Sequence, residues 1–369
     1  MTISWKKGCS PEQIVQKLES IRKNSTFGFP LWEFKEFEVH LHSLLDFPRD
    51  IPEVEARRIA RQCLHKASEK GCITSKSLLT EANRLERAYC DLPDHRYVLA
   101  TSLSVSRHRK LPKLIDNTYE DRTVVIFEPN LKTTFTKNLL DLRKAANDSV
   151  LAELPKDYHA VRLHVSAKSK YDAADKALNM IDLLRGIWNW RFNRMRPLRI
   201  TLSGKRDPVN QIALGPIHTL HHPSGKLATD TWWFDPVYLG PIKPLFMHQN
   251  ELEGMYEFTK NVRHLLKRCR YRSVIEGAII RYGRALDSRD WESAFLKLWS
   301  VLELLTDTQN NSYEVTVRRA SFLFTEDYEY HLQILQYLRE GRNSLVHLDK
   351  ENSAIETYLY QTKSYVEQL

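Results

Sequence analysis

Apolar residues recur at helical spacing along the first 92 residues of the chain. Four stretches share this pattern: residues 11–23, 31–45, 53–68 and 74–92. Ser10 can cap the first stretch, and Pro11 stands at the first helical position, where its missing N–H leaves no hydrogen bond unmade. We therefore expect a helical N-terminal region, residues 1–92, whose three or four helices can form a small bundle.

Near residue 93 the pattern changes to short runs rich in β-branched residues, which are typical of strands. These runs occupy residues 96–106, 123–128, 159–167 and 198–204. A helical pattern covers residues 172–192, between the last two runs. Two stretches rich in proline and glycine, 215–225 and 234–246, indicate loops and a linker. The sequence thus predicts a mixed α/β region over residues 93–249.

Helical periodicity returns at Glu251 and continues to the last residue. Its clearest stripe repeats every three or four positions and consists of Trp291, Phe295, Leu298, Leu302 and Leu305. Such a stripe is typical of a helix that is buried along one side. We therefore predict a helical bundle over residues 250–369, in a protein that is mainly α with a central mixed α/β region.

The composition is that of an ordinary globular protein of 369 residues, with 42% hydrophobic and 27% charged residues. The chain opens MTISWKKGCSPEQ, without the apolar segment of a secretory signal, and no apolar run approaches membrane-spanning length. The five cysteines are scattered and lack CxxC spacing, which argues against a disulfide framework and a cysteine zinc site. We expect a cytoplasmic protein with no membrane partner.

The net charge of +9 favours polyanionic partners, because basic side chains bind phosphates and release counterions. Basic residues cluster in 185–199, 260–272 and 106–113, and the first cluster interleaves arginine with Trp188 and Trp190. Arginine and aromatic residues together can hold single-stranded nucleic acid. The alternatives are tryptophans that belong to the core and basic residues on a plain solvated face. The candidate RNA contacts are Arg191, Arg194, Arg263, Lys267, Arg268 and Arg270.

Cofactor and metal motifs are weak in this sequence. Neither GxxxxGK[ST] nor GxGxxG occurs, so we expect no nucleotide cofactor. His218, His221 and His222 could hold zinc if a carboxylate arrived from elsewhere, which would suit a metal hydrolase. We favour a solvated polar loop for these histidines, because no HExxH or second cluster accompanies them, and we predict no metal site.

Arg342 and His347, in the stretch EGRNSLVHLDK, have the chemistry needed to cleave RNA without a metal. Histidine can exchange a proton with the ribose or the leaving oxygen near neutral pH, and arginine can stabilise charge on the phosphate. Residues five apart on one helix point about 140° apart, however. Three arrangements would overcome this separation: a helix break at Gly341, a long reach by the arginine, or a cleft shared with a second copy.

Three stretches together resemble the HEPN domain: RALDSRDWESAFLKLWSVLELLTD, VRRASFL and YLREGRNSLVHLD. Within that superfamily they are most similar to the Apea-like HEPN group of bacterial anti-phage defence. The resemblance covers roughly residues 255–369, about a third of the chain. The family motif is an arginine, a polar residue and a histidine, which correspond here to Arg342, Asn343 and His347.

The resemblance implies a dimer of helical bundles in which two motif helices form one composite site. Arg342 would then bind the scissile phosphate, His347 would act as acid or base, and Asn343 would orient the site. Glu303 would either position Arg342 or His347 as a partly buried carboxylate, or be a plain surface glutamate. The implied activity is a metal-independent endoribonuclease without a cofactor, restrained until a phage-derived trigger or partner protein acts. Residues 1–249 would sense that trigger or hold the substrate. The alternative is a non-catalytic HEPN regulator that dimerises or binds a ligand.

Overall fold

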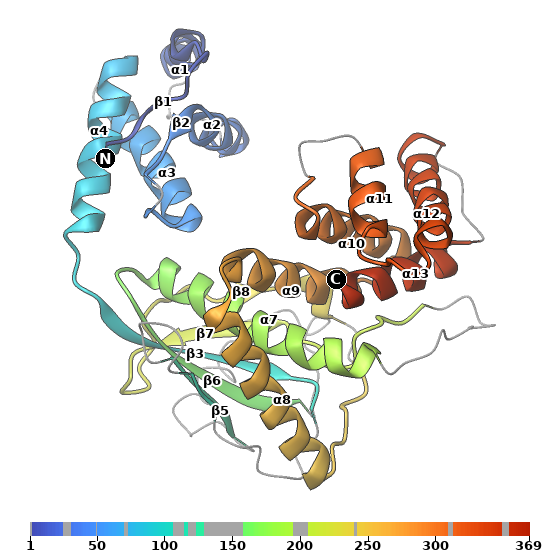
Figure 1. Ribbon diagram of the computed structural model, residues 1–369. Coiled ribbons are helices and arrows are strands. Elements are labelled where there is room, and N and C mark those ends of the chain that lie inside the picture. Colours follow the sequence, from blue (N-terminus) through green and yellow to red (C-terminus); the bar gives the residue numbers. More distant parts are fainter. Residues whose placement is uncertain are drawn as a thin grey trace. The chain divides into compact units, whose positions relative to one another are not determined.

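A computed structural model gives the fold of the chain (Figure 1). It describes residues 2–24, 31–48, 50–69, 73–105, 114–116, 123–128, 158–194, 206–239, 242–308, 313–348 and 354–369. These residues are mainly helical, with one sheet of six strands, so the predicted fold class is confirmed. No helix within the described ranges is both long enough and apolar enough to cross a membrane.

The chain divides into two compact units. The first comprises residues 1–96 and 166–176, and the second comprises residues 97–165 and 177–369. The boundary predicted between residues 249 and 250 lies inside the second unit, which holds both the sheet and the C-terminal helices.

Four helices and a two-stranded antiparallel ribbon make up most of the first unit. They are β1 (Ser4–Trp5), α1 (Pro11–Asn24), α2 (Leu31–Leu44), β2 (Leu45–Asp46), α3 (Glu53–Glu69) and α4 (Ser75–Cys90). The core contains Leu41, Ile59 and Leu78, one from each of α2, α3 and α4, all buried. A capping box at Thr74 and Ser77 fixes the start of α4, because each side chain bonds the backbone N–H of the other residue. The four predicted helices are confirmed.

The sheet belongs to the second unit. Its strands, in spatial order β4-β5-β6-β3-β7-β8, are β4 (Leu114–Asp116), β5 (Thr123–Glu128), β6 (His159–Ala167), β3 (His95–Leu103), β7 (Ile217–His221) and β8 (Trp233–Phe234). The strands predicted at 96–106, 123–128 and 159–167 are therefore confirmed, whereas the one predicted at 198–204 lies outside the described residues.

The loop predicted for residues 215–225 is wrong at its centre, because β7 occupies it. This strand pairs antiparallel with β3, with Val98 opposite His221. Both His218 and His221 are buried: a ring nitrogen of His218 bonds Thr101 at 2.8 Å. Burial lowers the pKa of His218 to about 4, so the imidazole stays neutral. The ring of His221 is hydrogen-bonded to Thr219 of the same strand and to the carbonyl oxygen of Gly225. The stretch predicted as a polar loop is therefore a strand whose two histidines are buried and hydrogen-bonded within the protein.

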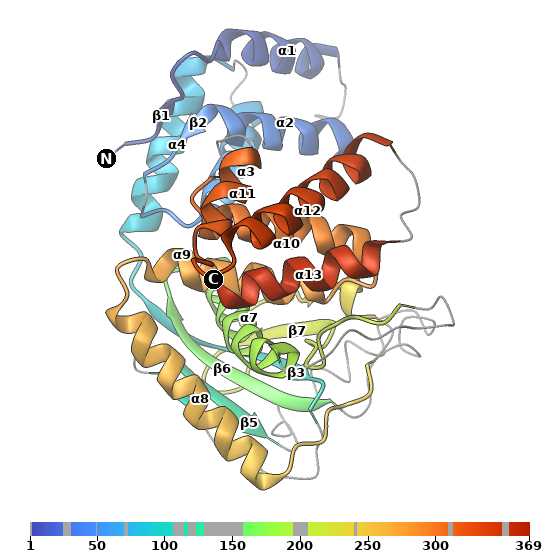
Figure 2. The same ribbon diagram turned by 45° about the vertical axis from the view of Figure 1, so that its right-hand side comes forward.

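The remaining helices of the second unit begin with α7, between β6 and β7, and continue after β8 to the end of the chain. They are α7 (Lys170–Arg194), whose first turns belong to the first unit, η1 (Pro236–Tyr238), α8 (Gln249–Arg268), α9 (Arg272–Leu286), α10 (Trp291–Leu305), α11 (Tyr313–Ser321), α12 (Tyr328–Leu348) and α13 (Ile355–Gln368). Helix α10 packs against α9, α11, α12 and α13 (Figures 1 and 2). Trp291, Phe295, Leu298 and Leu302 are buried there, and Leu305 is partly buried, which confirms the predicted stripe.

Two glycines allow α7 and α9 to cross at close range. A Cβ atom added to Gly186 of α7 would lie 2.7 Å from the carbonyl oxygen of Ile279, which no side chain tolerates. One added to Gly283 of α9 would lie 3.4 Å from the Cα atom of Gly186. Helices α7 and α9 therefore pack with their backbones in direct contact.

A fully buried arginine lies beside this crossing. Arg185 donates from Nη1 to Oδ1 of Asp287 at 2.6 Å and from Nη2 to Oδ1 of Asp182 at 2.8 Å. Arg284 donates from Nε to the other oxygen of Asp182 at 2.7 Å. The two arginines and two aspartates form a neutral cluster that ties α7 to α9. Arg185 is thus a structural cation and not part of a basic surface, which corrects its assignment to the first basic cluster.

Burial and charge oppose each other in this cluster. Burial alone would raise the pKa of Asp182, but Arg185 and Arg284 outweigh it and hold that pKa below its usual value. Burial would also lower the pKa of Arg185, and Asp287, Tyr238 and Asp182 together raise it well above its usual value. Asp182 and Arg185 therefore remain charged, and each of the two buried charges needs its partner.

Substituting Asp287 by alanine is expected to destabilise the protein by about 3–5 kcal/mol, because Arg185 would keep its charge in a buried site with one carboxylate missing. Urea denaturation followed by circular dichroism measures the change. Glu257→Ala is the matched control: it removes one partner of the exposed pair with Lys260 and should change stability by less than about 1 kcal/mol. Similar midpoints for the two variants would contradict this account of the cluster.

Candidate functional site

Helix α12 carries the three residues of the predicted motif. It runs from Tyr328 to Leu348 without interruption, so the proposed helix break at Gly341 is wrong. Gly341 is buried, and a Cβ atom there would lie 2.5 Å from Cε2 of Tyr358 in α13. The glycine is needed for close packing against that ring, not for a turn, because a helix tolerates glycine at a modest energetic cost.

The guanidinium of Arg342 is held in a defined position. Its Cζ atom lies 4.1 Å from the centre of the Tyr313 ring, which is close for a cation–π contact. Nη1 donates to Oδ1 of Asn343 at 3.3 Å. Arg342 is half-buried, so part of the guanidinium still faces solvent. The arrangement fixes a planar cation that keeps free donors for an anionic group.

Glu303 faces this arginine from α10. The residue is half-buried, and burial raises the pKa of its carboxyl. The Trp299 indole and the positive charge of Arg342 lower that pKa and offset part of the effect of burial. The indole N–H of Trp299 lies near the Glu303 carboxylate, but the two groups do not form a hydrogen bond of standard geometry. The structure therefore brings Arg342, Asn343 and Glu303 together, three of the four predicted catalytic residues.

His347, the fourth, lies in the last turn of α12, and its side chain falls outside the described part of the structure. Because α12 is one continuous helix, positions 342 and 347 are about 140° apart around its axis. Two of the three arrangements that would bring Arg342 and His347 into one site remain: a long reach by the Arg342 side chain, or a second copy of the helix.

Sequence reasoning missed Tyr313, which begins α11 and lies under the guanidinium of Arg342. One residue further, Glu314 pairs with Arg339 of α12 at 3.5 Å. These contacts fasten α11 to α12 along the motif. They join residues 25 or more positions apart, so no local pattern could have revealed them.

Five of the six predicted RNA contacts are exposed: Arg191, Arg194, Lys267, Arg268 and Arg270; Arg263 is half-buried. They lie on the last turns of α7, on α8 and just after it. The Cζ atom of Arg191 lies 5.1 Å from the centre of the Phe258 ring, so α7 and α8 are side by side. Trp188 is buried and donates to Oγ1 of Thr259 at 2.9 Å, which confirms the alternative that it is a core residue. The third basic stretch, 106–113, lies outside the described residues.

None of these six side chains takes part in the contacts described above for Arg342. The basic residues of α7 and α8 and the Arg342 arrangement therefore form two separate features of the second unit. Among the described residues, no group of three or more histidine, cysteine, aspartate or glutamate side chains is arranged to hold a metal ion.

The contact between α12 and α13 can be tested with two glycines. Gly341→Ala is expected to destabilise the protein by about 1–3 kcal/mol, because the new methyl group would overlap the Tyr358 ring. Gly277→Ala in α9 is the matched control. Nothing lies within 4 Å of the added atom there, so this change should stabilise the helix by about 0.5–1 kcal/mol. Denaturation midpoints that move in the same direction would refute the packing role of Gly341.

The chemistry available at this site is limited and definite. It offers one fixed guanidinium with free donors, an amide beside it and a carboxylate whose pKa is raised. Such a group of residues can bind a phosphate or a carboxylate and stabilise added negative charge on it.

No protein-family model, no curated protein and no solved structure matches this chain.

Proposed function

We propose that the chain is a metal-independent endoribonuclease of the HEPN type. The observation that carries the proposal is the fixed position of Arg342, stacked on Tyr313, bonded to Asn343 and facing Glu303. An arginine held in this way can bind the scissile phosphate and stabilise the charge that accumulates on it. The neighbouring carboxylate balances the cation before substrate arrives.

In the proposed reaction the ribose 2′-oxygen attacks phosphorus and the 5′-oxygen of the next nucleotide leaves. His347 takes the proton from the 2′-hydroxyl or gives one to the leaving oxygen, because imidazole titrates near neutral pH, and the His347 of a second copy or a water molecule exchanges the other proton. The products are a 2′,3′-cyclic phosphate and a free 5′-hydroxyl. No metal or cofactor takes part in any step.

A homodimer is the second part of the proposal. The continuous helix separates Arg342 and His347 around its axis, and a second α12 would supply the missing group across a shared cleft. Val346 lies one turn beyond Arg342 and is 48% exposed, an apolar side chain at the position where a second copy would pack. Two arginines and two histidines would then form one composite site.

The biological role that fits this activity is defence of a bacterial cell against phage, in the cytoplasm. A resting ribonuclease must be restrained, so a phage-derived trigger or a partner protein would release it. The exposed basic residues at the ends of α7 and α8 would hold RNA, with Arg194 and Lys267 among them.

The proposed activity is tested by incubating purified protein with total RNA and labelled tRNA in the presence of EDTA. The wild type should cut, and Arg342→Ala and His347→Ala should each slow cutting by about 100-fold or more, since both act in the transition state. Arg318→Ala is the control, because it removes an exposed arginine from the neighbouring helix α11 and should leave the rate unchanged. Cutting that EDTA abolishes, or that survives both substitutions, would refute the mechanism.

If the wild-type protein cuts no RNA in vitro, two interpretations remain: a restrained enzyme or a non-catalytic regulator. Cells that express the wild type or His347→Ala and are then challenged with phage distinguish the two. Protection by the wild type alone supports the enzyme, and equal protection by both supports the regulator.

The composite site makes a separate prediction about mixed dimers. A heterodimer of wild-type and His347→Ala chains, isolated with two different tags, should cut RNA at much less than half the wild-type rate, because both chains contribute to one cleft. A rate equal to half that of the wild type would show that each chain cuts alone. Light scattering on the same samples establishes that they are dimers.

A further inference from the structure

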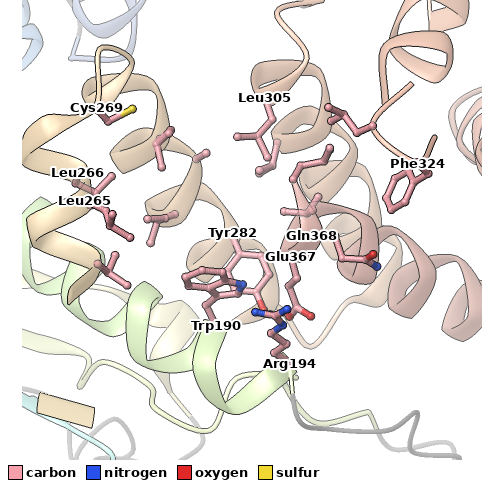
Figure 3. A pocket seen from close by; sticks show the side chains of 18 residues that line it. Trp190, Arg194, Leu265, Leu266, Cys269, Tyr282, Leu305, Phe324, Glu367 and Gln368 are labelled. Atoms are coloured by element: carbon pink, nitrogen blue, oxygen red, sulfur yellow. Dashed lines mark hydrogen bonds between the residues drawn. The ribbon is translucent and has the colours of Figure 1, made fainter. Parts of the chain in front are cut away.

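A cavity of about 650 Å³ lies among the C-terminal helices and the end of α7 (Figure 3). Neither Arg342 nor its neighbours Glu303, Tyr313 and Asn343 line it. Its walls come from the last turns of α7, from α8, α9, α10 and α13, and from the chain just after α11. This volume is in the range of cavities that bind small molecules in proteins.

Most of the wall is apolar. Leu266 and Val301 are buried and Ile279 is half-buried, while Leu265 and Leu323 line the same cavity although they are 67% and 62% exposed. Two exposed leucines from α8 and from the segment after α11 therefore flank its opening. Large apolar side chains that face water at the rim of a concave apolar wall are typical of a binding site.

One end of the cavity is polar, and its buried groups are already paired. The hydroxyl of Tyr282 donates to Glu367, and Nζ of Lys363 donates to the other oxygen of the same carboxylate at 3.0 Å. Burial raises the pKa of Glu367, and Lys363, the Tyr282 hydroxyl and the charge of Arg194 offset part of the rise. Lys363 thus balances the charge of Glu367.

Arg194 is the remaining charge at this end. It lines the cavity beside Glu367 and is exposed (Figure 3). Within the described parts of the chain it makes no ion pair. Among the described residues, the cavity wall therefore carries one cationic side chain, Arg194, and one carboxylate side chain, Glu367. Because the buried Lys363 already bonds that carboxylate, the guanidinium of Arg194 keeps donors for an added anion.

We propose that this cavity binds a small amphipathic anion, with a flat or chain-like apolar body between α8, α9 and α10 and one carboxylate, sulfonate or phosphate group at Arg194. The apolar wall removes the body from water, and the exposed guanidinium of Arg194 recognises the head group. The inference rests on the cavity and its charge alone and stands whether or not the chain cuts RNA.

Two dyes that share an apolar body test the proposal on the full chain. 8-Anilinonaphthalene-1-sulfonate carries an anionic group, and N-phenyl-1-naphthylamine has the same rings without one. Both should bind saturably, with one dye per chain. Arg194→Gln should weaken the sulfonate about tenfold or more and leave the neutral dye within about twofold, because only the anion uses the guanidinium.

Val262→Phe, which fills part of the cavity from α8, should weaken both dyes about tenfold, since it removes space from both. Arg281→Gln is the matched control: it removes an exposed arginine from α9 that does not line the cavity, and both affinities should stay unchanged. Circular dichroism verifies that each variant is folded.

Three results would overturn the proposal. The first is the absence of saturable binding, and the second is an equal effect of Arg194→Gln and Arg281→Gln on the sulfonate. The third is release of dye when the protein concentration is raised, which would show that a second copy of the chain covers the cavity.

Discussion

The guanidinium of Arg185 has no exposed surface, so carboxylates at the crossing of α7 and α9 must balance its charge. A buried unpaired cation would cost several kcal/mol, so Asp182 and Asp287 must lie on either side of it. Asp287 is the residue that ends α9. The ionic cluster therefore fixes both the position of α7 and the point where α9 stops.

Hydrogen bonds extend this cluster through the second unit. Asn210 donates to Asp287 at 2.7 Å and accepts from Asn193, which also donates to the hydroxyl of Tyr282. Tyr282 in turn bonds Glu367 of α13. Polar groups thus connect the helix that follows β6 to the last helix of the chain. Because a partly satisfied buried network is costly, its members must be ordered together, which makes the sheet and the bundle one unit.

The sequence predicted those elements whose signal is local. The stripe from Trp291 to Leu305 specifies α10 by its own periodicity, and the short β-branched runs specify β3, β5 and β6. Prediction from the sequence failed where contact with a residue far away in the chain determines the local structure. The polar histidines of β7 become buried because β3 pairs with this strand, and Gly341 lies inside α12 where close packing against Tyr358 requires a glycine. Periodicity carries no information on such partners.

The same distinction applies to the candidate site. Arg342 could be selected from its residue type and its spacing to His347, and Asn343 and Glu303 from the resemblance to the HEPN domain. Tyr313 could not, because its role consists only of the ring that it presents to a guanidinium 29 positions further along the chain. Arg185 shows the converse: in the sequence it resembled the arginines around it, and only its buried partners separate a structural cation from a surface one.

Helix α10 joins the candidate site to the cavity. Val301 and Leu305 line the cavity, whereas Glu303 lies between them in sequence, about 200° around the helix from Val301, and faces Arg342. An occupant of the cavity would contact one side of α10 and could act on Arg342 only through movement of the helix as a whole. The buried stripe along α10 resists such movement, because Phe295, Leu298 and Leu302 are packed without exposed surface. A ligand would therefore change the site only if its affinity differed between two packed positions of this helix.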